Sequence, residues 1–333
     1  MYTGLFIGGD MQRLFFVLSA LIFSIGAHAT DWEEYPESLP QFSFPGDSLR
    51  QQWDNLTRLT QVAYPDENWI KSMMTDYPRL AHHMMVLGSD PDSHPAVFKA
   101  IQDSDYSDLA AAVQEVWRLH YSGHYREAYK LGMQLGPFGE VPAIYSRLVH
   151  ATLLIEDHDE KMSEFSESAA LSNEGLTLAP EYRFAEFGLV YAKVRMLELL
   201  STGEARSSGY IPIAQDKLDK LQEYAPDRGA YPLTRGGLEA GIVERVGSFL
   251  GSITYGATES SAIENFELAR KLLPDMAIVY NEYSVGLKRL DEDDFRKEIR
   301  ELLNTCIGLT PVNAEDALNQ MHCKRSLEKN TKD

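Results

Sequence analysis

The sequence has few cysteines, few basic residues and almost no strand patterns. Only Cys306 and Cys323 occur in 333 residues, too few for a disulfide scaffold. Lys and Arg number 31 against 50 Asp and Glu residues, which gives a formal net charge of −19. A nucleic-acid or anionic-membrane surface needs concentrated basic residues, so we expect neither partner. Alternation of β-branched and polar residues is nearly absent, which argues against an extensive sheet.

Motifs of the common enzyme classes are also missing. The chain has no Gly-x-x-x-x-Gly-Lys-Ser/Thr phosphate loop, no His-Glu-x-x-His, no Gly-x-Ser-x-Gly and no Cys-x-x-Cys. Gly236 and Gly237 do not follow a predicted strand, so they are not a dinucleotide-binding fingerprint. We therefore predict a non-catalytic protein without a cofactor.

The N-terminal segment, residues 1–29, is typical of a secretory signal. An apolar run over 14–26 follows Arg13, and small residues precede a cleavage site near Ala29. Met11 would give a more usual signal length. No cysteine follows the run, so a bacterial lipoprotein anchor is not expected. We predict a periplasmic or secreted protein with no membrane span after cleavage. Whether the two cysteines pair there stays open.

The remaining chain divides into four segments. Residues 30–47 are acidic and rich in proline, which predicts an extended lead-in. Residues 48–104 have helical spacing of apolar residues and predict an N-terminal helical cap. Residues 105–311 alternate helix and short turn, and residues 312–333 predict a C-terminal capping helix and tail. Prolines recur at the predicted helix ends, at Pro180, Pro226, Pro274 and Pro311.

One unit within 105–311 carries a specific spacing of small, large and helix-ending residues. Ala262, Phe266 and Ala269 precede Pro274 at intervals that let two helices approach at the alanines. This unit resembles the tetratricopeptide repeat family, and weaker units follow the same pattern elsewhere in the segment. The resemblance implies an all-α fold: a right-handed superhelical array of antiparallel helix hairpins, that is, a TPR-like solenoid.

Glycines inside a predicted helix need an explanation. Gly237, Gly241, Gly247 and Gly251 lie in one helical stretch, and each costs about 1 kcal/mol relative to alanine in a helix interior. Two interpretations stay open. Either a neighbouring helix packs closely against the glycine face, or the groove is hollowed so that a ligand reaches the backbone.

The family register also implies which residues line a concave binding groove. Such a groove suits a protein or peptide partner. The alternative is an exported accessory component of a tripartite (TRAP-type) solute-uptake system, binding a small-molecule ligand or a solute-binding protein. The groove residues implied by the resemblance are Trp117, His120, Glu244, Gly247, Gly251, Thr254, Asn281 and Lys288.

A metal-handling protein is a second alternative. Met73, Met74 and the run from His82 to Met85 combine soft and imidazole ligands. Adjacent helical residues point about 100° apart, so the run does not converge on one ion. His120 and His124 are four residues apart, but no third ligand is evident. We therefore predict no metal site.

Overall fold

Helices make up the regular structure of the described chain. The computed structural model describes residues 32–330, and this part contains seventeen helices and no strand. The all-α prediction is therefore confirmed for these residues. None of the helices between residues 32 and 330 has the length and apolar character needed to cross a bilayer. The predicted signal segment, residues 1–29, lies outside the described residues.

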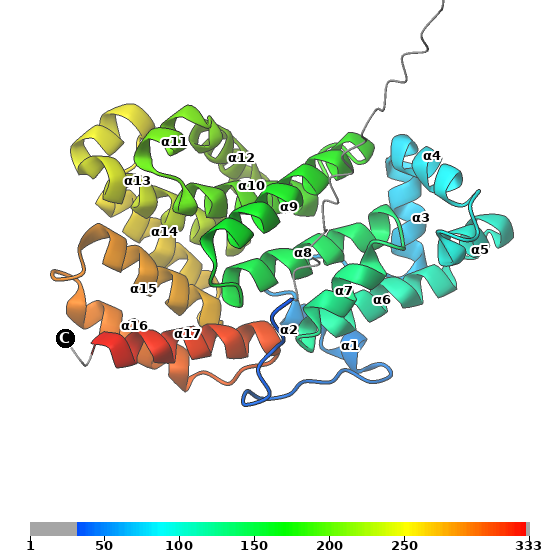
Figure 1. The fold of residues 1–333 in the computed structure, drawn as a ribbon, viewed down its shortest axis with the longest axis horizontal. Coiled ribbons are helices and arrows are strands. Elements are labelled where there is room, and N and C mark those ends of the chain that lie inside the picture. Colours follow the sequence, from blue (N-terminus) through cyan, green and yellow to red (C-terminus); the bar gives the residue numbers. More distant parts are fainter. Residues whose placement is uncertain (1–31, 331–333) are drawn as a thin grey trace, which may run out of the picture. The chain divides into compact units, whose positions relative to one another are not determined.

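The helices are named in chain order (Figure 1). The first group is α1 (Ser48–Gln51), α2 (Trp53–Leu56), α3 (Glu67–Asp76), α4 (Pro78–Leu87) and α5 (Pro95–Asp103). The middle group is α6 (Ser107–Tyr121), α7 (Tyr125–Gly132), α8 (Pro137–Leu153), α9 (His158–Leu178), α10 (Arg183–Leu199), α11 (Thr202–Ser207) and α12 (Tyr210–Tyr224). The last group is α13 (Ala230–Tyr255), α14 (Glu259–Leu272), α15 (Ala277–Asp291), α16 (Arg296–Gly308) and α17 (Ala314–Asn330).

Proline and capping residues set several helix ends. Helices α9, α12, α14 and α16 end two or three residues before Pro180, Pro226, Pro274 and Pro311, because a residue that precedes proline disfavours helical backbone angles. At the other end of α14, the Thr258 hydroxyl accepts a hydrogen bond from the Ser261 amide at 3.0 Å, which caps the helix. The predicted positions of these helix ends are confirmed.

Consecutive helices pack on one another. Helix α7 lies against α8, α9 against α10, α13 against α14, and α15 against α16 (Figure 1). Such pairing is what helix hairpins joined by short turns produce. It accounts for the helical spacing of apolar residues throughout 105–311, because each helix buries a stripe on its neighbours.

The C-terminal helix α17 makes contacts far from its place in the sequence. It packs on α15 and α16 and also touches α6 and α8. The Tyr145 hydroxyl of α8 donates to Glu315 of α17 at 3.1 Å, and His322 Nε2 lies 2.8 Å from the Leu153 carbonyl oxygen. Repeats of an open solenoid contact only their neighbours. Helix α17 therefore does more than cover the last hairpin, which was the role predicted for the C-terminal segment.

A disulfide fixes α17 to α16. Cys306 and Cys323 are bonded, with their Cα atoms 6.4 Å apart, and both side chains are fully buried. The sequence left this pairing open, since spacing alone does not determine whether two cysteines meet. The bond constrains the segment that turns from α16 back across α15.

The spacing around Phe266 is explained by close contacts with α15. Ala262, Phe266 and Ala269 are fully buried. The Phe266 ring stacks on Tyr283 with centroids 4.9 Å apart. A Cβ atom added at Gly286 would lie 2.3 Å from this ring. The ring therefore occupies space that only glycine at position 286 leaves open.

Gly286→Ala is expected to lower the free energy of unfolding by about 1 to 3 kcal/mol, because overpacking at a fully buried ring outweighs the gain in helix propensity. Urea denaturation followed by circular dichroism measures the change. Gly308→Ala is the matched control, because no atom lies within 4 Å of the added Cβ there. A Gly286→Ala protein as stable as this control would contradict the close packing.

Candidate functional site

A cavity lies among α8, α9, α10 and α13. Its volume is about 80 Å³, counted as space open to the centre of a water molecule. One water needs roughly 10 to 15 Å³ on this measure, so the cavity has room for several waters or a small ligand. Residues from α3, α4, α15 and α17 also contribute to the walls.

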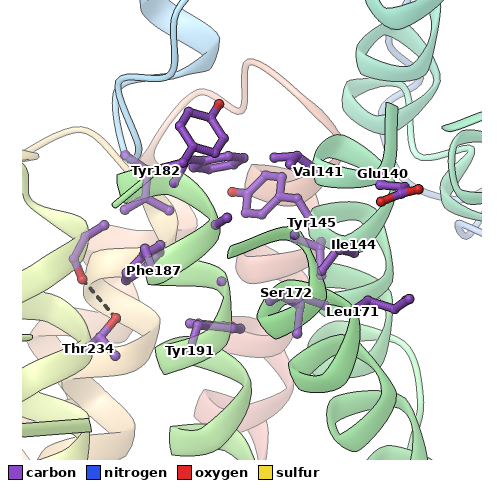
Figure 2. Close-up of a pocket in the computed structure, with 18 of the residues that line it drawn as sticks. Glu140, Val141, Ile144, Tyr145, Leu171, Ser172, Tyr182, Phe187, Tyr191 and Thr234 are labelled. Atoms are coloured by element: carbon purple, nitrogen blue, oxygen red, sulfur yellow. Dashed lines mark hydrogen bonds between the residues drawn. The ribbon is translucent and has the colours of Figure 1, made fainter. Parts of the chain in front are cut away.

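The cavity walls are mainly apolar and aromatic. The side chains of Tyr145, Tyr182 and Phe187 surround the same space, with Glu140 and Thr234 on opposite sides of the view (Figure 2). The other aromatic residues that line the cavity are Trp69, Phe138, Phe184 and Tyr191. Walls of this kind, with few polar groups, are typical of sites for apolar small molecules.

A buried carboxyl group of α17 lies in the wall. Glu315 accepts a hydrogen bond from the Tyr145 hydroxyl at 3.1 Å and is 8% exposed. Burial raises the pKa of Glu315 to about 7, and the neighbouring Asp316 carboxylate adds to the shift. The Glu315 carboxyl is therefore largely protonated below neutral pH and ionised above it.

A network of ion pairs lies where α10 packs near α15. Arg195 pairs with Glu198 at 3.0 Å and with Glu282 at 2.5 Å, and Arg289 pairs with Glu198 at 3.0 Å. Burial alone would raise the pKa of Glu198, but Arg195 and Arg289 outweigh it and lower this pKa to about 2. The two arginines and two glutamates balance in charge, so this wall has no net attraction for an ion.

The third polar group is Glu140, in the first turn of α8. Burial raises the pKa of the Glu140 carboxyl, and the Glu174 carboxylate raises it further. Thr234 uses its hydroxyl to donate to the Ala230 carbonyl at 2.9 Å. No histidine is among the described residues that line the cavity. The site therefore combines apolar surface with a few hydrogen-bonding groups, which suits binding and orientation of a ligand.

The eight groove residues implied by the sequence do not form one surface. Trp117 and His120 are buried in the N-terminal core, 2% and 0% exposed. The His120 Nδ1 atom lies 3.0 Å from the Ser146 hydroxyl, and burial lowers the pKa of His120 to about 3. These two side chains serve packing, and they are not accessible to a partner in this structure.

Helix α17 covers the part of the expected groove on α15. Asn281 is buried and donates to the Asn319 side chain of α17 at 3.0 Å. Lys288 donates to the Ser326 hydroxyl of α17 at 2.6 Å. The resemblance placed both residues on an open concave face, and this placement is wrong because the C-terminal helix packs there.

The glycines of α13 have different structural roles. Glu244, Gly247 and Thr254 are exposed. Gly247 has a φ of +77° and interrupts α13 with a bend, a conformation that glycine adopts readily. An added Cβ at Gly251 would lie 2.9 Å from the Ala257 carbonyl oxygen, so this glycine packs against the following turn. At Gly247, therefore, the bend explains the glycine, and neither close packing of a neighbouring helix nor ligand access to the backbone does.

Gly237 is the glycine of α13 that lines the cavity. No atom lies within 4 Å of a Cβ atom added there. The ligand-access interpretation of the glycines therefore has support at Gly237, whereas Gly247 and Gly251, which were assigned to the groove, lie elsewhere on α13.

The methionine and histidine clusters do not converge. Met84 is fully buried, whereas Met85 is 52% exposed on the same helix, α4. His120 is buried and His124 is exposed. Across residues 32–330, no three His, Cys, Asp or Glu side chains are grouped so as to hold a metal ion.

The cavity residues were not predicted from the sequence. The aromatic spacing of Phe184, Phe187 and Tyr191 on α10 was available as a signal, but the same spacing is typical of a packed core. Comparison with known proteins adds no assignment: no family model matches the chain, and no curated protein matches it significantly.

Proposed function

We propose that this protein is a non-catalytic binding protein for an apolar small molecule, held in the cavity among α8, α9, α10 and α13. The observation that carries the proposal is the aromatic-lined cavity of about 80 Å³ with few polar groups. An empty apolar cavity of this size loses packing contacts, so an occupant of matching chemistry would stabilise the fold. The charge balance around Arg195 favours an uncharged ligand over an anion.

The peptide groove implied by the resemblance has less support, because α17 covers Asn281 and Lys288. Small-ligand binding agrees with the alternative of an accessory component of a solute-uptake system. The TPR-like character of residues 105–311 and export of the protein are further parts of this proposal. N-terminal sequencing of protein from the exported fraction tests export, and a mature start near Thr30 is expected.

Binding of the neutral apolar dye N-phenyl-1-naphthylamine tests the cavity. We expect its fluorescence to increase on binding the purified protein, and Gly237→Leu to weaken binding by about tenfold or more, because the added side chain extends into the free volume at the cavity wall. Leucine also improves helix propensity over glycine, so folding is expected to be retained.

Gly308→Leu is the matched control, since this glycine lies on the exposed end of α16, and we expect it to bind the dye as the unmodified protein does. Absence of dye binding, or equal affinity of the Gly237→Leu protein with its melting temperature unchanged, would contradict a ligand site in this cavity. Organic extraction of freshly purified protein followed by mass spectrometry identifies any ligand that it retains.

A further inference from the structure

The second part of α13 carries an exposed patch of large apolar side chains. Phe249 is 76% exposed, Leu250 54% and Ile253 69%. They lie in a stretch from Val246 to Thr258 that contains no charged residue, although the whole chain has a net charge of −19. Exposed apolar groups of this kind on a soluble surface mark interaction sites. We call Phe249, Leu250 and Ile253 the α13 patch.

The backbone explains why these side chains are exposed. Gly247 bends α13 at a φ of +77°, so the last turns do not continue the buried stripe of the first part. Gly256, at a φ of +66°, ends the helix, and Gly251 packs on the Ala257 carbonyl oxygen. Residues 249, 250 and 253 then share one face of a short helix, and this face is directed away from the core.

We propose that the α13 patch docks on the surface of a lipid bilayer. The three exposed side chains present on the order of 350 Å² in total, since large side chains have areas of roughly 150 to 250 Å². A stable protein interface buries about 800 Å² on each side, so the patch alone would supply less than half of one. Apolar side chains that insert into the interfacial region of a bilayer need no matching protein surface.

Charge also favours a neutral lipid surface. The patch offers no lysine or arginine to attract anionic headgroups, and the acidic chain is repelled by them. Docking therefore depends on apolar insertion. It is expected to resist high salt and to be stronger on neutral vesicles than on anionic ones.

A second cavity is lined by residues that flank the patch in the sequence, and it shares wall residues with the first. This second cavity has a volume of about 30 Å³ on the same measure, and Val246 and Tyr255 of the α13 end contribute to its lining. It shares Val194, Glu198 and Gly237 with the cavity of the proposed ligand site. Docking of the patch would place this second cavity beside the lipid, so that an apolar ligand exchanges with the bilayer without crossing water. This role in exchange rests on the proposed function.

Co-sedimentation with vesicles of pure phosphatidylcholine tests the docking. The unmodified protein is expected to sediment with them, equally at low salt and in 1 M NaCl, and less with vesicles that contain phosphatidylglycerol. Phe249→Ser with Ile253→Ser is expected to weaken partitioning by about tenfold or more, because burial of both apolar side chains is lost. Met85→Ser with Val86→Ser is the matched control, since these residues form another exposed apolar pair, on α4, and we expect it to sediment normally.

Two outcomes would overturn the docking: no sedimentation of the unmodified protein with neutral vesicles, or equal sedimentation of the Phe249→Ser, Ile253→Ser protein. A concentration-dependent dimer that the same double variant abolishes would also overturn it, in favour of a second copy. Dye binding measured without vesicles tests the proposed function separately. A protein that binds the dye but not the vesicles would therefore contradict the docking alone.

Discussion

Arg147→Met is expected to lower the free energy of unfolding by about 3 to 5 kcal/mol, because it leaves a buried carboxylate without its partner. Arg147 of α8 is 5% exposed. It donates to both oxygens of Glu164 on α9, and its Nη2 atom also lies 2.7 Å from a Glu167 oxygen. Hydrogen bonding to Arg147 lowers the pKa of Glu167 below its usual range. The guanidinium therefore joins α8 to α9.

A double variant that removes both charges distinguishes the contribution of the ion pair to stability from that of side-chain packing. Arg147→Met combined with Glu164→Leu is expected to recover most of the lost stability, because two apolar side chains replace a buried pair without stranding a charge. Urea denaturation of the single and double variants at pH 7 measures both effects. If Arg147→Met alone cost less than about 1 kcal/mol, Glu164 would have to be hydrated in the folded protein, contrary to its burial.

Local features of this chain were predictable because their causes lie close together in the sequence. Pro180, Pro226 and Pro274 act on the residues just before them, and the spacing of Ala262, Phe266 and Ala269 reflects one helix face. The burial of Phe266 followed from that spacing. Its contact with Gly286 did not, because this glycine belongs to the next helix and nothing in its own sequence context indicates a close approach.

The candidate site was not predictable because its walls come from distant segments. The hydrogen bond between Tyr145 and Glu315 joins residues 170 positions apart, and no local pattern specifies the return of α17 to α8. The same return explains the error at Asn281 and Lys288, since the repeat register assumes an open face where α17 packs. The aromatic residues of α10 have core-like spacing, so a cavity is visible only after the helices are placed.

The carboxyl group that α17 brings into this site makes stability depend on pH. The pKa of Glu315 is about 7 in the folded protein, against an ordinary value of 4.5. The unfolded chain releases this proton near pH 4.5, whereas the folded protein holds it until about pH 7. The free energy of unfolding therefore falls as pH rises through this window, by about 3 kcal/mol in total, and it does not recover at higher pH. Asp316, whose pKa burial raises to about 6, acts in the same direction.

Buried histidines act in the opposite direction. Burial lowers the pKa of His120 to about 3 and that of His150 to about 4. The unfolded chain therefore takes up these protons near pH 6.5, where the folded protein does not, and stability is lost as pH falls below that value. Between about pH 4.5 and pH 6 the contributions of Glu315 and Asp316 to the pH dependence are therefore opposed by those of His120 and His150.

Glu315→Gln removes one of these carboxyl contributions. It is expected to change how the free energy of unfolding depends on pH. The glutamine oxygen still accepts from Tyr145, but the side chain does not ionise. The variant should match the unmodified protein at pH 4 and exceed its free energy of unfolding by about 3 kcal/mol at pH 8. Urea denaturation across this range measures the difference, with Glu301→Gln on the exposed face of α16 as a control expected to change it by less than about 0.5 kcal/mol. A variant that is no more stable at pH 8 than at pH 4, relative to the unmodified protein, would mean that the folded protein hydrates the Glu315 carboxylate, and the wall beside Tyr145 would then be open to water.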